Sequence, residues 1–328
     1  MTIIADIEVQ VGQEASDAWG TEVTPTVKLM GVSEVEIVPL VDVQQIEELR
    51  GTRVPAYHSL VYTVGGEGSL SSLLSYDDLP YWLQGMFGEV VATSDTSGWL
   101  HAFDAPVESS DSENSTSYTI AKGDGTNIYS LKGATVNTIT ISGESGAPAE
   151  ISVEFIGKFV STDVFAALSD RTVTYVMGDH IALYIDAGSD AVGGTLASDI
   201  GWSFELVMEA NREVKRHLGD LQPGSYREAK MSGTLSLSLE HDSLSEAYLV
   251  EMLGATTEGV TKNVRIYAVD ANGYSMTVDF SGVLSGEPAM FTDVDGVVSM
   301  DLELMGQKTS GASDWLSIDV INNVETLA

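Results

Sequence analysis

The chain has 328 residues, of which 49 are acidic and 15 are basic, so its formal net charge is −34. A field of this sign repels phosphate groups, which argues against a protein that grips DNA, RNA or an anionic membrane surface. The hydrophobic fraction of 43% is sufficient for packed cores, whereas the absence of cysteine excludes disulfides, thiol catalysis and thiolate-bound metals.

The first predicted element is a strand near the N-terminus, where Ile7, Val9 and Val11 alternate with polar residues. Asp6 and Glu8 interrupt the apolar run that a secretion signal requires, so we expect none. No window approaches the roughly 18 apolar residues of a membrane span, and we expect no membrane partner. A length near 330 residues favours about two domains.

An internal similarity dominates the middle of the chain. Residues 68–88 read GSLSSLLSYDDLPYWLQGMFG, and residues 233–254 read GTLSLSLEHDSLSEAYLVEMLG. Each copy predicts a glycine-led strand, an acidic turn, a short helix and a terminal glycine. In the first copy Asp78 is expected to cap the helix, and in the second Ser243 and Glu246 form a capping-box pattern. The predicted apolar face of the first helix is Leu79, Trp82, Leu83, Met86 and Phe87.

Two further pairs of segments extend this similarity. ISVEFIGK at 151–158 is similar to MDLELMGQ at 300–307, and GVSEVEI at 31–37 to GWSFELV at 201–207. Most other segments alternate apolar and polar residues, as strands do. We therefore predict an all-β protein with one short helix per domain. Its two tandem β-sandwich or barrel domains, residues 1–165 and 166–328, are related by internal duplication, with a polar surface loop at 109–117.

No chemical site emerges from the motifs. The five histidines lack metal-binding spacing, and no GxSxG nucleophile elbow is present. Asp293-Val294-Asp295-Gly296 looks like a calcium loop but lacks its next ligand and its closing glutamate, so a hairpin turn is favoured. We predict no catalytic residue, no metal and no cofactor.

The arginines are clustered. Five of the seven fall in two segments that precede the glycine-led strand of each copy. They are either solvated polar arms or contacts to an acidic surface, for which another copy of this acidic chain is the obvious source. A basic arm that meets an acidic face is a head-to-tail contact, which closes into rings or propagates as a stack. The candidate stacking residues are Arg50, Arg53, Arg212, Lys215, Arg216 and Arg227.

The order of GTEVTPT at 20–26, IEELRGTR at 46–53, the glycine-strand-DLPYWL-helix segment and ISVEFIGK resembles the tail tube protein of long-tailed, non-contractile phages and archaeal viruses. This resemblance implies two packed antiparallel sheets beside a helix. It also implies stacked rings whose sheets form a continuous barrel around a lumen for DNA. Chains with two tube domains resemble members that form trimers with pseudo-sixfold symmetry. The arms, here 45–57 and 214–226, then contribute to contacts between rings.

The resemblance implies a structural protein of the virion tail, assembled in the host cytoplasm, and not an enzyme. Expected partners are further copies in trimeric rings, a tape measure protein, and tail terminator or distal tail proteins, while double-stranded DNA passes without specific binding. Strands that line such a lumen should alternate apolar with small polar or acidic residues. The candidates are Ser152, Glu154, Thr234, Ser236, Ser238, Glu240, Asp301 and Glu303. On an ordinary sandwich the same residues would face bulk solvent.

Two alternatives stay open on the sequence. One is a secreted-type β-sandwich module that binds carbohydrate or acts as a glycoside hydrolase, since paired carboxylates could serve that chemistry. The other is a different tail component on the same fold, such as a terminator or distal ring. The surplus of acids over only eight lysines also suggests a halophilic host, because concentrated salt screens self-repulsion.

Overall fold

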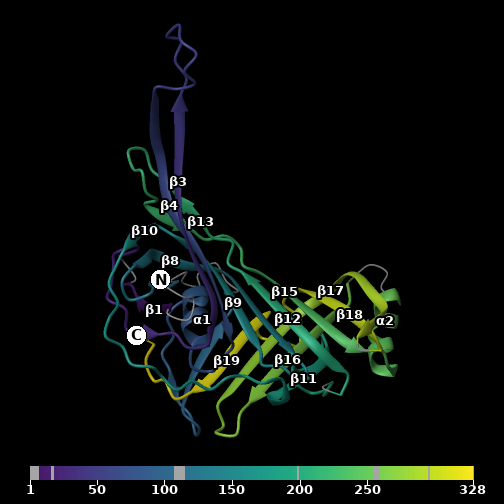
Figure 1. The fold of residues 1–328 in the computed structure, drawn as a ribbon. Coiled ribbons are helices and arrows are strands. Elements are labelled where there is room, and N and C mark those ends of the chain that lie inside the picture. The colour runs from purple at the N-terminus through teal and green to yellow at the C-terminus, as the bar shows by residue number, and fades with distance from the viewer. Residues whose placement is uncertain are drawn as a thin grey trace.

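The computed structural model describes residues 7–15, 18–106, 115–197, 199–254, 259–294 and 296–327. The fold consists mainly of antiparallel strands, so the predicted all-β class is confirmed (Figure 1). Two α-helices lie in these residues, α1 (Leu79–Phe87) and α2 (Ser243–Gly254), together with a 3-10 turn at Gly178–His180. Neither helix has the length and apolar character needed to cross a membrane.

Eight strands form one continuous antiparallel layer, which we call the inner sheet. Its first four strands come from the first half of the chain and its last four from the second, and the junction is the pairing of β8 with β12. In spatial order the strands are β3 (Val32–Ile46), β4 (His58–Leu73), β9 (Glu150–Gly157), β8 (Ile128–Glu144), β12 (Gly201–Glu209), β15 (Ser232–Glu240), β18 (Val297–Gly306) and β17 (Ser275–Val294).

The two halves contribute these strands in the same order. In each half a first strand is followed by the glycine-led strand, by the strand similar to ISVEFIG, and by one long strand. The order agrees with the internal similarity of the sequence. Ile37 pairs with Gly68 in the first half, and Met208 pairs with Gly233 in the second, which aligns β3 with β12.

The long strands β8 and β17 leave the inner sheet and continue into an outer layer. The outer layer of the first half also contains β1 (Glu8–Gln13), β2 (Val27–Lys28), β7 (Ser117–Gly123) and β10 (Phe159–Thr162). That of the second half contains β11 (Ile181–Ala187), β16 (Thr261–Val269) and β19 (Leu316–Asn322), extended by β6 (Trp99–Asp104) and β5 (Thr93–Ser94) of the first half. The two halves therefore interlock.

A glycine enables the turn of β8 from one layer to the other. Gly133 has φ +66°, and a Cβ there would lie 2.9 Å from the indole nitrogen of Trp19. Only glycine adopts this backbone conformation without strain. The indole Nε1–H of Trp19 also donates to the Gly133 carbonyl at 2.9 Å, which holds the chain at the bend.

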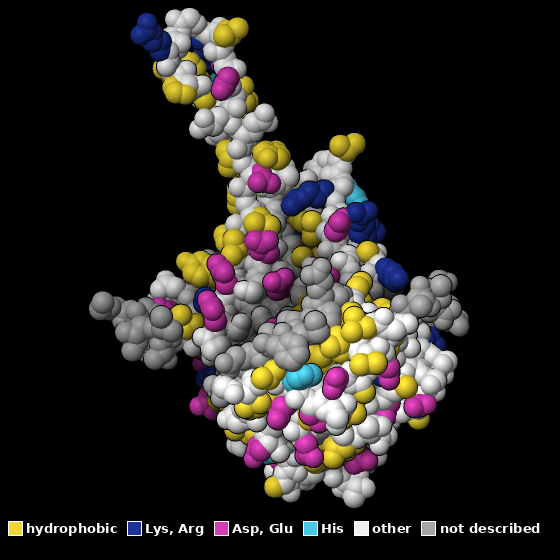
Figure 2. Space-filling view, turned by 90° about the vertical axis from the view of Figure 1, so that its right-hand side faces the viewer, with side chains coloured by type: hydrophobic (Ala, Val, Ile, Leu, Met, Phe, Trp, Pro, Cys, Tyr) yellow, Lys and Arg dark blue, Asp and Glu magenta, His cyan; other side chains and the backbone are white. Residues whose placement is uncertain are grey.

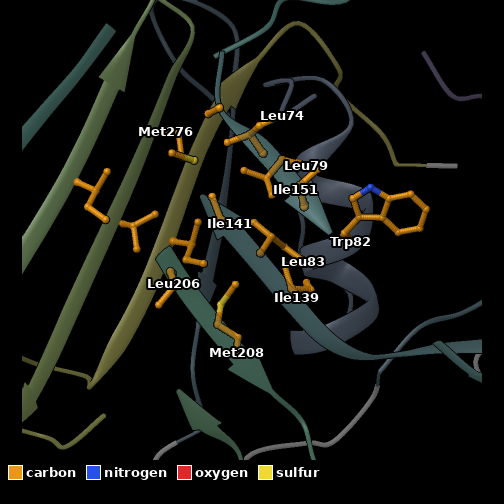
Figure 3. Packing of buried hydrophobic residues seen from close by; sticks show 14 of the residues in the cluster. Leu74, Leu79, Trp82, Leu83, Ile139, Ile141, Ile151, Leu206, Met208 and Met276 are labelled. Atoms are coloured by element: carbon orange, nitrogen blue, oxygen red, sulfur yellow. The ribbon is translucent and has the colours of Figure 1, made fainter. Parts of the chain in front are cut away.

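One hydrophobic core runs through both halves (Figure 3). Leu79 and Leu83 of α1 face β8 residues such as Ile139, and Leu206 and Met208 of β12 continue the same cluster. The core of the first half is therefore continuous with that of the second. Helix α1 is buried on nearly all sides, because Tyr81 and Gln84 are also buried in addition to the predicted apolar face.

The helix ends differ from the predictions by small shifts. Asp78 stands at the N-cap of α1 without capping it, because its carboxylate forms an ion pair with Arg171. At α2 the capping box lies one residue earlier than predicted. Asp242 Oδ1 accepts from the amides of Leu244 and Ser245 at 2.7 and 3.0 Å, while Asp242 N donates to Ser245 Oγ at 2.9 Å.

Two predicted loops fall partly outside the described residues. Of the polar segment 109–117, the structure describes only residues 115–117, and Ser117 already begins β7. The calcium-like sequence at 293–296 contains Asp295, which is also outside; the neighbouring strands β17 and β18 pair directly as far as Val294 and Val297, as the predicted hairpin requires.

Candidate assembly surfaces

All eight lumen candidates lie on one face of the inner sheet. Along each strand they alternate with buried residues of the core, so their side chains point away from it. The strand register brings candidates from different strands into direct pairs, with Ser236 opposite Glu303 and Ser238 opposite Asp301. Ser152 and Glu154 hold the same position on β9, next to Thr140 and Thr138 of β8.

The same face includes residues that the sequence reasoning missed. They are the polar residues on the solvent-facing side of β3, β4, β8 and β12, where Val38 and Val207 also lie, and the strand pairing places them in register with the eight candidates. The additional residues are Glu34, Glu36, Glu67, Ser69, Ser71, Thr138, Thr140, Ser142, Glu144, Ser203, Glu205 and Glu209. These residues could have been found from the alternation of polar and apolar residues in SEVEI, TITIS and SFELVME. We call this set, with the eight candidates, the polar face.

No member of the polar face is a lysine or an arginine. Within the described part of the chain, no ion pair involves a carboxylate of this face. The carboxylates accept hydrogen bonds from serines instead, for example Asp301 from Ser238 at 2.8 Å and Glu303 from Ser285 at 2.9 Å. Because a serine hydroxyl leaves the charge uncompensated, the face keeps a negative potential.

The first arm, residues 40–65, is the outer end of the β3–β4 hairpin and projects from the body (Figures 1 and 2). It is longer than the predicted segment 45–57, because the two strands remain paired out to Ile46 and His58. Apolar side chains are exposed on both of its faces, namely Leu40, Val41, Val43, Leu60, Val61 and Tyr62. A hairpin that buries so little apolar surface by itself is expected to be covered by a partner.

The tip of the first arm carries Arg50 and Arg53. The Arg50 guanidinium forms an ion pair with Glu48 and lies 4.7 Å from the ring centroid of Tyr57. Arg53 is exposed and takes part in none of the ion pairs between described residues. Of the two arginines at this tip, Arg53 is therefore the one outside these ion pairs, and the exposed Glu47 carries a negative charge at the same tip.

The second arm, residues 213–227, is a shorter hairpin of β13 (Glu213–Lys215) and β14 (Ser225–Arg227). Arg227 pairs with Glu213 across it, whereas Lys215 is exposed. Arg216 Nη1 donates to the carbonyl of Val64 at 3.0 Å, and the amide of Val64 donates to the carbonyl of Leu221 at 2.9 Å. The second arm therefore packs against the base of the first, and the two arms are not geometrically equivalent.

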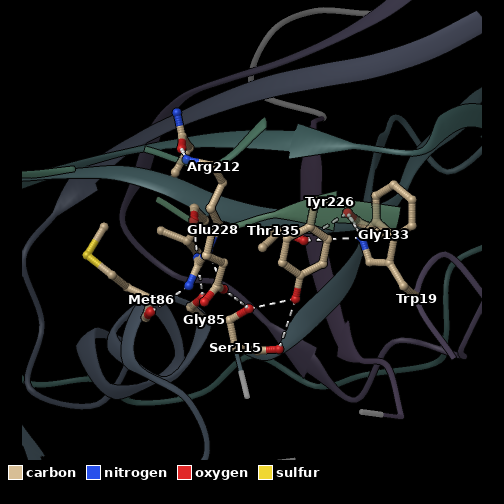
Figure 4. Close-up of polar contacts among 11 residues, drawn as sticks. Trp19, Gly85, Met86, Ser115, Gly133, Thr135, Arg212, Tyr226 and Glu228 are labelled. Atoms are coloured by element: carbon tan, nitrogen blue, oxygen red, sulfur yellow. Dashed lines mark hydrogen bonds and ion pairs between the residues drawn. The ribbon is translucent and has the colours of Figure 1, made fainter. Parts of the chain in front are cut away.

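Arg212, the sixth arm candidate, lies inside the chain (Figure 4). It is 5% exposed, and its Nε bonds Glu228 at 2.8 Å. Nη1 and Nη2 donate to the carbonyls of Gly85 and Met86 at 2.9 and 2.7 Å, in the last turn of α1. Its guanidinium is thus used within the chain, and Arg212 is removed from the set of stacking residues.

In the ranges that the structure describes, no group of three or more histidine, aspartate or glutamate side chains is arranged to hold a metal ion.

Comparison with known proteins identifies the family of the chain. The family model described as phage tail tube protein matches residues 4–296, which is most of the chain. A comparison with curated proteins finds no match. The chain therefore belongs to the phage tail tube protein family and is a structural component of a virion tail.

Proposed function

We propose that three copies of this chain close into a ring, and that the rings stack into the tail tube of a long-tailed, non-contractile virus. In this proposal the polar face lines the lumen, through which the genome passes during ejection. The chain is read as two tube modules, residues 1–165 and 166–328, which arose by duplication.

The pairing of β8 with β12 is the observation that carries the proposal. It joins the last inner strand of one module to the first inner strand of the next, over Thr138 to Glu144 of β8. At the two ends of the inner sheet, β3 pairs only with β4, and β17 beyond Ser285 pairs only with β18, among the described strands. Open edges of this length are normally covered, and pairing of β17 with β3 of the next copy repeats the β8–β12 junction.

The same junction repeated between copies generates a closed ring. It is a head-to-tail contact, which closes when the rotation per copy divides the full circle. The family resemblance gives rings of six modules, so three copies that carry two modules each complete one. Closure turns the inner sheets into one barrel without edges, with the polar face toward its lumen.

The negative lumen suits passage of DNA. Carboxylates and hydroxyls without basic neighbours do not bind phosphates, so the duplex would slide without capture. The outer end of the first arm, with Arg53 at its tip, is the part of the chain that reaches furthest from the body and would contact the adjacent ring. Tape measure, terminator and distal tail proteins are the expected partners, with assembly in the host cytoplasm.

Electron microscopy of the purified protein over a concentration series tests the proposal. The wild type should form rings and tubes. Arg50→Glu combined with Arg53→Glu should leave the rings intact and abolish long tubes, because the tip of the arm then repels an acidic neighbouring ring. Lys230→Glu with Lys308→Glu is the matched control, since both lysines are exposed and lie outside the arms.

Each outcome discriminates between functions. Long tubes formed by the arm variant, or an equal loss of tubes in the control, would reject the role of the arm tip. Rings of wild-type protein that never stack would indicate a terminator or distal ring instead. A monomer at every concentration would reject the tube function. Neither the family match nor the geometry offers support for carbohydrate binding or hydrolysis.

A further inference from the structure

Helix α2 exposes apolar side chains that its counterpart α1 does not. Tyr248 and Leu249 attach α2 to the core, but Val250 and Leu253 are 60% and 75% exposed. In α1 the residues from Leu79 to Met86 are all buried. The difference calls for an explanation, since the two helices follow equivalent strands in the two halves of the chain.

In the first half, part of the cover of α1 comes from the second half. The segment that follows β12 places Arg212 on the last turn of α1, where it donates to the Gly85 and Met86 carbonyls (Figure 4). Strand β12 is the first inner strand of its module. The helix of one module is thus contacted by the segment that continues the first inner strand of the next module.

The equivalent contact for α2 must come from a β3 strand, and the strand pairing shows which residues it offers. Ile37 and Met208 are equivalent, because each pairs with the glycine of its glycine-led strand, Gly68 or Gly233. Arg212 lies four residues after Met208, beyond the end of β12 at Glu209, and Val41 lies four residues after Ile37, where β3 is still paired with β4. Val41 therefore corresponds to Arg212 in distance along the chain. Val41 and Val43 are 52% and 53% exposed. Where the junction within the chain has an arginine, β3 presents valines.

We propose that Val41 and Val43 of one copy pack against Val250 and Leu253 of α2 of the neighbouring copy, as the contact that completes the junction between copies. The occupant of the exposed face of α2 is therefore a second copy of this chain. The inference rests on the proposed ring, and it adds the residues that recognise the neighbour.

The two junctions differ in chemistry, and this difference favours a ring in which first and second modules alternate. The junction within the chain joins a guanidinium to helix carbonyls, and the junction between copies joins apolar side chains. A second module placed where a first module belongs would set the Arg212 guanidinium against Val250 and Leu253, where it keeps Glu228 but loses the carbonyls of Gly85 and Met86. Such mismatches disfavour the wrong partner more than they stabilise the right one. Modules therefore alternate around the ring.

Charge substitution on α2 tests the contact in the full-length chain. Val250→Asp with Leu253→Asp should raise the concentration needed for ring formation by about tenfold or more, because two apolar contacts are lost and two charges are placed at the junction. Ring formation is followed by light scattering after size-exclusion chromatography. Val91→Asp with Val164→Asp is the matched control, because these two valines are also highly exposed.

Cross-linking tests the same contact without introducing a charge into α2. The chain has no cysteine, so Val41→Cys with Leu253→Cys introduces the only two thiols. A short bifunctional maleimide should link neighbouring copies into covalent dimers and trimers. The pair Val91→Cys and Leu253→Cys should remain monomeric under the same treatment.

The outcomes separate this inference from the proposed function. Wild-type rings together with unchanged assembly of the aspartate variant, or with no link between the thiols introduced at positions 41 and 253, would overturn the α2 contact and leave the tube function standing. Absence of wild-type rings at every concentration would overturn both.

Discussion

At the scale of single residues, Arg212 shows how a side chain that belongs to one half of the chain stabilises the other. Its guanidinium is buried, bonds the carboxylate of Glu228, and donates to three carbonyls of the first half, those of Gly85, Met86 and Val136. A charge in such a place is tolerable only because every side of it has a partner. The residue therefore fixes the relative position of the two halves at their junction.

Replacing Arg212 by alanine should lower the free energy of unfolding by about 3–5 kcal/mol, because Glu228 and the helix carbonyls lose their common donor. Urea unfolding followed by circular dichroism measures the change. Arg216→Ala is the control, since Arg216 is exposed and should cost at most about 1 kcal/mol. Equal midpoints for both variants would contradict the structural role of Arg212.

A second residue-scale expectation concerns Asp319 on β19, where β6 of the first half joins the second. Burial raises the pKa of Asp319, and the carboxylates of Asp104 and Asp279 raise it further, against the influence of Arg265. The folded state thus binds the proton more tightly than the unfolded chain. The contribution of Asp319 to stability is greatest below its unfolded pKa near 3.8, and is lost as pH rises through the raised folded pKa.

Asp319→Asn should therefore be more stable than the wild type at pH 7, and the advantage should shrink as the pH falls toward 4. Comparing urea midpoints of the two proteins at several pH values cancels the titration of the other acids. Glu325→Gln, which also removes one carboxylate but at an exposed site, is the control for the loss of a charge. An advantage for Asp319→Asn that grows at low pH would reject the assignment.

At the scale of elements, the sequence predicted the parts whose residues repeat a pattern. The glycine-led strands and the ISVEFIG strand follow from alternation, because one face of each is buried, and the two helices follow from apolar residues at helical spacing. The capping residues were harder to predict. The carboxylate of Asp78 binds Arg171 instead of capping the helix. Arg171 is 93 residues away in the sequence, so a local sequence pattern could not indicate this ion pair.

The first arm shows why the rest could not be predicted. Residues 40–46 and 58–65 carry apolar side chains on both faces and pack on no core, so the period-two signal that marks a half-buried strand is missing. The role of Arg212 was equally hidden. Its clustering with Lys215 and Arg216 indicated a surface arm, whereas its partners Gly85 and Met86 lie in the other half of the chain.

At the scale of the whole molecule, the charges that make up the net charge of −34 are distributed unevenly between the polar face and the two arms. The polar face carries carboxylates and hydroxyls without lysine or arginine, and the arms carry Arg50, Arg53, Lys215, Arg216 and Arg227. In the proposed tube, part of the surplus acid serves DNA passage and part contacts the arginines of the arms. A halophilic host remains a hypothesis, which tubes that stay intact after removal of salt would contradict.

The charge of the polar face leads to the last prediction. Glu154→Lys with Glu303→Lys places cations at two exposed positions of this face, on β9 and β18. Since lysines bind phosphates by releasing counterions, virions that carry the variant should eject DNA more slowly, and the effect should fade as salt rises. Tubes of the variant should also retain short double-stranded DNA on sedimentation, whereas wild-type tubes should not.

Glu89→Lys with Glu325→Lys is the control that makes this prediction specific. It changes the net charge by the same amount at exposed sites outside the polar face. If general charge governed ejection, both variants would slow it alike; if the polar face lines the lumen, only the first should. Normal ejection and no DNA retention by the Glu154 and Glu303 variant, in tubes that assemble, would place this face on the outside of the tube. Another surface of the chain would then line the lumen.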